Sequence, residues 1–139
     1  MSTKPVLVAP QEREPLYLYL AATKQVVSTV LVVERAEEGK IHGVQRPIYY
    51  VSEVLSASKQ RYPHYQKLAY GVFMTARKLT HYFSEHPVTV LTDAPLSDIL
   101  NNPEATGRVA KWGIKLSPRD ITYRPRDALK SQALADFLA

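Results

Sequence analysis

The chain has 139 residues, of which 45% are hydrophobic and 22% charged, so its size and composition suit a single globular domain. No apolar run approaches the roughly 20 residues that a membrane-spanning helix needs, and the first residues lack a secretory signal. Because the chain has no cysteine, disulfides, thiol catalysis and the usual structural zinc sites are excluded. These features favour an intracellular protein that acts without a membrane.

The net charge of +5 comes entirely from one C-terminal stretch. That stretch also holds two acids, whereas the rest of the chain has eleven residues of each sign. Its basic residues are Arg108, Lys111, Lys115, Arg119, Arg124, Arg126 and Lys130. A local excess of positive charge is typical of a surface that binds a polyanion such as nucleic acid, and equally of a solvated basic face without a specific partner.

The N-terminal half has the pattern of β-structure. Residues 1–14, with two prolines and no periodicity, are expected to form a linker or tail ahead of a domain spanning residues 15–139. Alternation over residues 16–21 predicts a strand, and the β-branched run over residues 26–33 predicts a second. A third is expected at residues 44–52. The short connections indicate an antiparallel meander.

Beyond residue 60 the apolar residues recur with helical spacing. One stripe from Tyr65 to Phe83 predicts a long helix that Pro87 ends, with Lys67 outside the stripe. The remaining elements are expected to be a strand at 88–91, helices at 96–100 and 106–116, a strand around 121–123 and a helix at 131–138. A strand reached through a long helix is most simply parallel to an earlier one. The pattern predicts an α/β fold: a mixed five-stranded sheet, made of a three-stranded meander and two further strands, flanked by helices.

Several short motifs occur in an informative order. They are Tyr49-Tyr50-Val51-Ser52, Arg61-Tyr62-Pro63, Ala76-Arg77-Lys78-Leu79, Val88-Thr89-Val90-Leu91-Thr92-Asp93, Lys111-Trp112, Asp120-Ile121-Thr122-Tyr123-Arg124-Pro125 and Gln132-Ala133-Leu134-Ala135-Asp136. The ordered set resembles the ribonuclease H region of reverse transcriptases from gypsy-type LTR retrotransposons, in particular those of plants. The resemblance covers residues 15–139 and implies the RNase H-like fold. That fold normally cuts the RNA strand of an RNA–DNA hybrid with two Mg²⁺ ions held by converging carboxylates.

Carried over by position, the resemblance implies a degenerate carboxylate set. Ala21 stands where the first strand of the family has aspartate, and Gln66 and Leu68 replace the glutamates of the long helix. Asp93 after the fourth strand and Asp136 on the last helix survive. Because such groups act as a unit, losing them costs several powers of ten in rate, so we expect no catalytic residues and no cofactor.

The function implied is that of a non-catalytic connection or tether domain in a reverse transcriptase polyprotein. Its expected partners are an RNA–DNA hybrid or template–primer and the neighbouring polymerase and downstream nuclease, in the cytoplasm or nucleus or within a virus-like particle. The chain stops inside its expected last helix, which favours a piece of a longer polyprotein.

Two other functions remain open from the sequence. One is an active Mg²⁺-dependent nuclease in which Glu53 or Glu34 joins Asp93 and Asp136 as a substitute metal ligand. The other is a domesticated scaffold that binds proteins.

Several of these residues also have plain structural explanations. Asp93 precedes Pro95 and a short helix, so it could cap that helix rather than mark a former metal site. Asp136 could be a solvent-facing acid, and Trp112 is expected in the core. Four histidines without ligand spacing are expected on the surface: His42, His64, His81 and His86.

Overall fold

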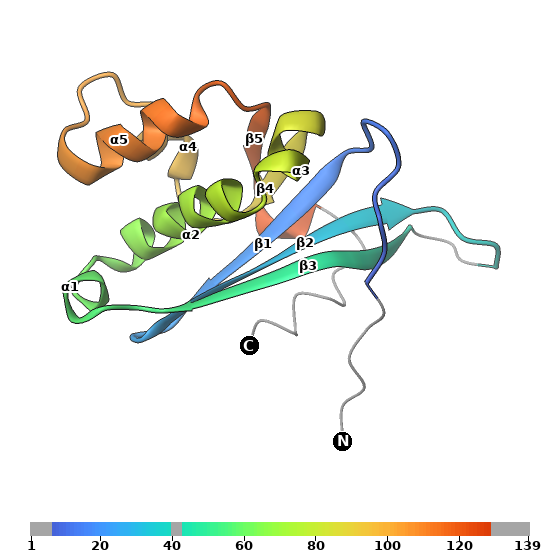
Figure 1. The fold of residues 1–139 in the computed structure, drawn as a ribbon, viewed down its shortest axis with the longest axis horizontal. Coiled ribbons are helices and arrows are strands. Elements are labelled where there is room, and N and C mark those ends of the chain that lie inside the picture. The colour runs from blue at the N-terminus through green and yellow to red at the C-terminus, as the bar shows by residue number, and fades with distance from the viewer. Residues whose placement is uncertain (1–6, 40–42, 129–139) are drawn as a thin grey trace.

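The computed structural model describes residues 7–39 and 43–128, and Figure 1 shows its strands and helices. The strands are β1 (Leu16–Ala22), β2 (Val26–Arg35), β3 (Val44–Val54), β4 (Val88–Leu91) and β5 (Ile121–Arg124). The helices are α1 (Ala57–Gln60), α2 (His64–Lys78), α3 (Thr80–Glu85), α4 (Leu96–Leu100) and α5 (Gly107–Leu116), followed by the 3₁₀ turn η1 (Arg126–Ala128). The helix expected at 131–138 lies outside the described residues.

The five strands form one mixed sheet in the order β3-β2-β1-β4-β5. The β1–β2 and β2–β3 pairs are antiparallel, which confirms the expected meander. The β1–β4 and β4–β5 pairs are parallel, as expected for strands reached through helices. The predicted α/β class and mixed five-stranded sheet are therefore confirmed.

Helix α2 lies along one face of the sheet, with α5 packed against its far side (Figure 1). A glycine permits the close approach: a Cβ at Gly71 would lie 3.0 Å from Cγ1 of Val27 on β2. One turn later, the Thr75 hydroxyl donates to the Gly71 carbonyl at 2.7 Å and lies 2.8 Å from the Thr29 hydroxyl. Because Thr75 has one hydroxyl hydrogen, Thr29 must donate to Thr75. This buried chain of hydrogen bonds fixes α2 on β2.

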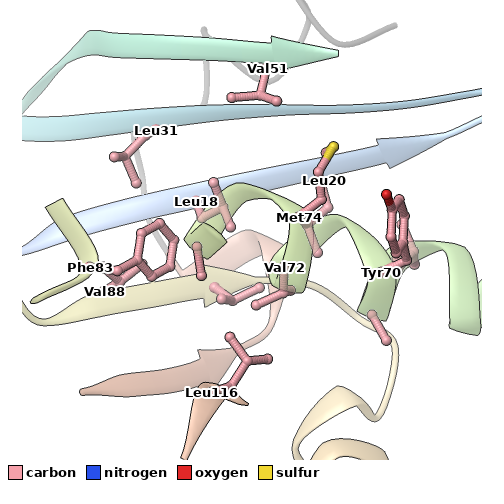
Figure 2. Close-up of a cluster of buried hydrophobic side chains, with 14 of the residues drawn as sticks. Leu18, Leu20, Leu31, Val51, Tyr70, Val72, Met74, Phe83, Val88 and Leu116 are labelled. Carbon is pink, nitrogen blue, oxygen red and sulfur yellow. The ribbon is translucent and has the colours of Figure 1, made fainter. Parts of the chain in front are cut away.

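The main hydrophobic core fills the space between the sheet and its helices. Figure 2 shows side chains from β1, α2, α3, β4 and α5 in this cluster, including Leu18, Val72, Phe83 and Leu116. Trp112, which is 5% exposed, lies against the rings of Tyr62, Tyr70 and Phe73. The core position expected for Trp112 is confirmed, and its ring joins α5 to α2.

The single helix expected through Phe83 is wrong. Helix α2 ends at Lys78, and Leu79, with φ −111° and ψ 46°, separates it from α3. The Leu79 N–H still bonds the Thr75 carbonyl at 2.8 Å, so the helix closes its last turn before the chain changes direction. The break re-aims α3, and Phe83 remains in the core at 1% exposure.

Three polar or aromatic side chains also depart from the expected pattern. Tyr65, placed in the apolar stripe, is 42% exposed, whereas Lys67, placed outside it, is 6% exposed. The Lys67 ammonium donates to the carbonyls of Thr23 and Lys24 at 3.2 and 2.9 Å, so its stem lies along the core while its charge is satisfied in the β1–β2 turn. His86 is 7% exposed, so its expected surface position is wrong, and its Nδ1 lies 2.9 Å from the Glu14 carbonyl oxygen.

The described part of the expected N-terminal tail contacts the sheet. Val8 N–H donates to the Pro47 carbonyl at 3.0 Å, and Glu14 forms a bidentate ion pair with Arg35 on β2 at 2.8 and 2.9 Å. The Arg35 hydrogen bonds hold the pKa of Glu14 below its usual value. Within the described ranges, no helix has both the length and the apolar character to cross a bilayer.

Candidate nucleic-acid interface

A hollow of about 430 Å³ opens where β1 and β4 end beside the first turns of α2. Its described lining is Leu20, Ala21, Ala22, His64, Leu68, Leu91, Thr92, Asp93, Ala94 and Arg126. Strand β1, helix α2 and the end of β4 thus bring Ala21, Leu68 and Asp93 to one place. By the resemblance, these are three of the positions at which the family has metal-binding carboxylates. Asp136 lies outside the described residues.

The described lining of this hollow does not fit a Mg²⁺ site. Ala21 and Leu68 carry no donor atom, and Asp93 is the one carboxylate among the described lining residues. Its Oδ1 already accepts the Arg126 N–H at 3.1 Å. Over the described residues, no three histidine, aspartate or glutamate side chains are grouped so as to hold a metal. Because Mg²⁺ requires several oxygen ligands, one exposed carboxylate is insufficient.

Asp93 does not cap the short helix after it, so the structural alternative that the sequence left open for this residue is wrong. Helix α4 begins after Pro95 and has no side-chain cap, while the Thr92 hydroxyl accepts the Ala94 N–H at 3.1 Å. Asp93 instead accepts from Arg126, the first residue of η1. The carboxylate therefore links the end of β4 to the segment after β5.

Neither proposed substitute ligand, Glu34 or Glu53, lines the hollow. Glu53 on β3 accepts from the Tyr70 hydroxyl at 2.7 Å and from Lys59 Nζ at 3.2 Å. Burial alone would raise the pKa of Glu53, but these hydrogen bonds outweigh it and hold that pKa below its usual value. Because β2 and β1 separate β3 from β4, roughly 14 Å of sheet lies between Glu53 and the β4 strand.

Gln66, at the other replaced glutamate position, lies outside the described lining of the hollow and contacts α5. Its Oε1 accepts from Arg108 Nη1 at 3.1 Å, and the Arg108 guanidinium lies 4.3 Å from the Tyr62 ring centroid. Arg108 is exposed, but these contacts fix its direction. Gln66 therefore positions a cation at the start of α2.

The basic residues expected to bind nucleic acid separate into two groups. Arg126 lines the hollow, its guanidinium 5.9 Å from the Tyr19 ring centroid, and Arg124 is exposed at the end of β5. The other group lies on α5 and immediately after it: Arg108, Lys111, Lys115 and Arg119. Lys130 lies outside the described residues.

A groove of about 470 Å³ between α5 and the α2–α3 junction gathers three cations. Lys115 and Arg119 face Arg77 of α2 across a floor that includes Phe73 and Leu116. Arg119 donates to Thr80 Oγ1 at 2.8 Å and to the Ser84 hydroxyl. Sequence reasoning missed Arg77, because it lies far from the basic stretch along the chain. A usable signal was present, since neither α2 nor α5 contains an acid.

The chain is similar to one protein family. The family model described as the RNase H-like domain found in reverse transcriptase matches residues 11–118. None of the curated proteins compared with the chain matches it.

Solved structures of foamy viral protease–reverse transcriptase share the fold. The complex with dsDNA has a TM-score of 0.61 and 22% identity, over 88% of this chain and 25% of that chain. The dRH form with dsDNA has a TM-score of 0.62 and 16% identity, over 88% and 21% of the two chains. The complex with RNA/DNA hybrid has a TM-score of 0.56 and 18% identity, over 84% and 16%. This chain thus spans a quarter or less of each of them.

Proposed function

This chain belongs to the RNase H-like domains found in reverse transcriptase, and on that premise we propose that it is a catalytically degenerate copy. Its role is that of a connection or tether domain in the polyprotein of a plant gypsy-type LTR retrotransposon. It supports binding of the RNA–DNA hybrid or template–primer and joins the polymerase to a downstream nuclease. Such a domain works inside the cell, in the cytoplasm, the nucleus or a virus-like particle, and needs no Mg²⁺.

The observation that carries this proposal is the composition of the hollow. Two of the family positions that meet there are Ala21 and Leu68, and neither side chain can hold a metal, a water or a proton. The sheet, α2 and the core around the hollow are nevertheless intact. A preserved scaffold with apolar residues in place of ligands suits binding rather than phosphodiester cleavage.

Positive charge on the helical side supports the nucleic-acid part of the proposal. Helices α2 and α5 carry exposed cations and no acid, so their field attracts phosphates. The foamy viral relatives of this fold are complexes with dsDNA and with RNA/DNA hybrid. Binding through such contacts weakens steeply as salt rises.

The test combines cleavage and binding on one labelled RNA–DNA hybrid. We expect salt-sensitive binding and no cleavage above background in Mg²⁺ or Mn²⁺, with Asp93→Asn identical to the wild type. An active RNase H on the same substrate serves as the positive control. Metal-dependent cleavage that Asp93→Asn abolishes would establish the nuclease instead, and failure to bind hybrid at low salt would remove the nucleic-acid role.

A further inference from the structure

A row of cations follows the exposed side of α5. Arg108, Lys111 and Lys115 are spaced so that they lie on one side of the helix, and Arg119 comes just after it. Arg77 of α2 meets the end of this row in the groove. These five residues are called the basic track.

Contacts between the two helices fix the direction of the basic track. Arg108 bonds Gln66 near the start of α2, and Arg119 bonds Thr80 just beyond its end. Between them the rings of Phe73 and Trp112 stack with centroids 6.1 Å apart. Helices α5 and α2 therefore run side by side in the same direction, and the track spans about 16 Å along α2 from Gln66 to Arg77.

The basic track begins at the first turn of α2, where Arg108 bonds Gln66, on another side of the helix from His64 and Leu68, which line the hollow. It ends beside α3, where Asp120 directly follows Arg119 and Glu85 is the acid nearest to Arg77 along the chain. Among the described residues, Arg77, Lys111 and Lys115 have neither an ion pair nor a hydrogen bond from their side chains, and all three are exposed. The Arg77 guanidinium lies 5.1 Å from the Phe73 ring centroid, but no described acid pairs with any of the three, so their charge is available to a ligand.

Resting on the proposed function, we propose that the basic track binds consecutive phosphates of one nucleic-acid strand without a metal ion. A row this long suits a repeated charge, because a single small anion would occupy the groove at Arg77 and Lys115 and leave Arg108 and Lys111 unused. The exposed side chain of Ile114 lies next to Lys115 in sequence and offers an apolar contact beside it. The track thus holds the strand from the side of α2 and α5 by its cations. The hollow cannot do so through metal ions, because it lacks the ligands to bind them.

The experiment compares two charge-matched double variants of the whole chain. Arg77→Gln/Lys115→Gln removes two track cations that make no described hydrogen bond, and Lys24→Gln/Arg46→Gln removes two cations from the β1–β2 turn and β3. Affinity for a short RNA–DNA hybrid with a single-stranded extension is measured by fluorescence anisotropy across salt concentrations in EDTA. Thermal unfolding by circular dichroism checks that both variants fold.

The expected result is a loss of about tenfold or more for the track variant and a salt slope lowered by about 2, with the control within about twofold of the wild type. Equal losses in both double variants, or affinity that requires Mg²⁺, would overturn the track while leaving hybrid binding intact. Polyglutamate bound as tightly as the oligonucleotide would instead assign the track to an acidic protein segment. A wild-type chain that binds no hybrid removes the proposed function itself, and the track with it.

Discussion

The hollow and the basic track both lie along α2, but they differ in what they offer a ligand. The hollow has few donor atoms, whereas the track has several cations. The hollow brings Ala21, Leu68 and Asp93 together, but Ala21 and Leu68 have no donor atom and Asp93 is the one carboxylate in its described lining. The track carries five cations, and the side chains of Arg77 and Lys115 form no ion pair or hydrogen bond with other described residues, although the Arg77 guanidinium lies 5.1 Å from the Phe73 ring centroid. The comparison teaches that packing holds a site's geometry independently of its donor atoms.

The largest expected effect is a gain of metal binding in the hollow. Ala21→Asp/Leu68→Glu adds two carboxylates beside Asp93, so calorimetry should detect Mg²⁺ uptake that the wild type lacks. Leu68 is 9% exposed, so the glutamate also lowers stability by burying charge. The amide pair Ala21→Asn/Leu68→Gln is the matched control and should take up none. A carboxylate variant that folds but binds no Mg²⁺ would contradict the assignment of these positions.

Removing the ring that anchors the basic track should be the largest loss of stability. Trp112→Ala deletes a side chain packed on three aromatic rings, which should lower the free energy of unfolding by about 3–5 kcal/mol in urea titrations. Ile114→Ala on the same helix is the control, because Ile114 is 70% exposed. It should change stability by less than about 0.5 kcal/mol. Similar losses in the two variants would mean that α5 is not held by Trp112.

A smaller loss is expected at the hydrogen bond that ties α2 to the sheet beneath both sites. Thr75→Val leaves the buried Thr29 hydroxyl without its acceptor, and should lower the free energy of unfolding by about 1–3 kcal/mol. Thr75→Ser keeps the hydroxyl and should retain most of the stability. Thr29→Val/Thr75→Val removes both polar groups, and should be more stable than Thr75→Val alone. A double variant that loses the sum of the single effects would argue against the pairing.

The smallest expected effect separates the two regions directly. Arg126→Gln removes a cation that lines the hollow, with its guanidinium 5.9 Å from the Tyr19 ring centroid, and that lies outside the basic track. Affinity for hybrid should therefore fall by about twofold or less. Anisotropy titrations alongside the Arg77→Gln/Lys115→Gln variant make the comparison. If Arg126→Gln costs as much as that double variant, the hollow contacts phosphate and the contrast between the regions fails.

Much of the fold was predictable, because the local pattern of apolar residues agrees with the faces that the folded structure buries. The alternation from Leu16 to Leu20 and the β-branched run of β2 both predict strands. The folded sheet buries most of the side chains of these two strands. The break at Leu79 was not predictable, because the apolar spacing continues across it. The burial of Lys67 also escaped the pattern, since only the folded β1–β2 turn brings the two carbonyls that receive its ammonium.

The candidate site divides in the same way. The amino-acid sequence by itself determined the order of the five strands, the absence of donor atoms at Ala21 and Leu68, and the basic excess near the C-terminus. Only the tertiary structure decided that Ala21, Leu68 and Asp93 share one hollow, and that Arg77 joins Lys115 across a groove. The physical reason is that sequence patterns report on residues close together along the chain. A site forms where segments that are far apart in the sequence pack together.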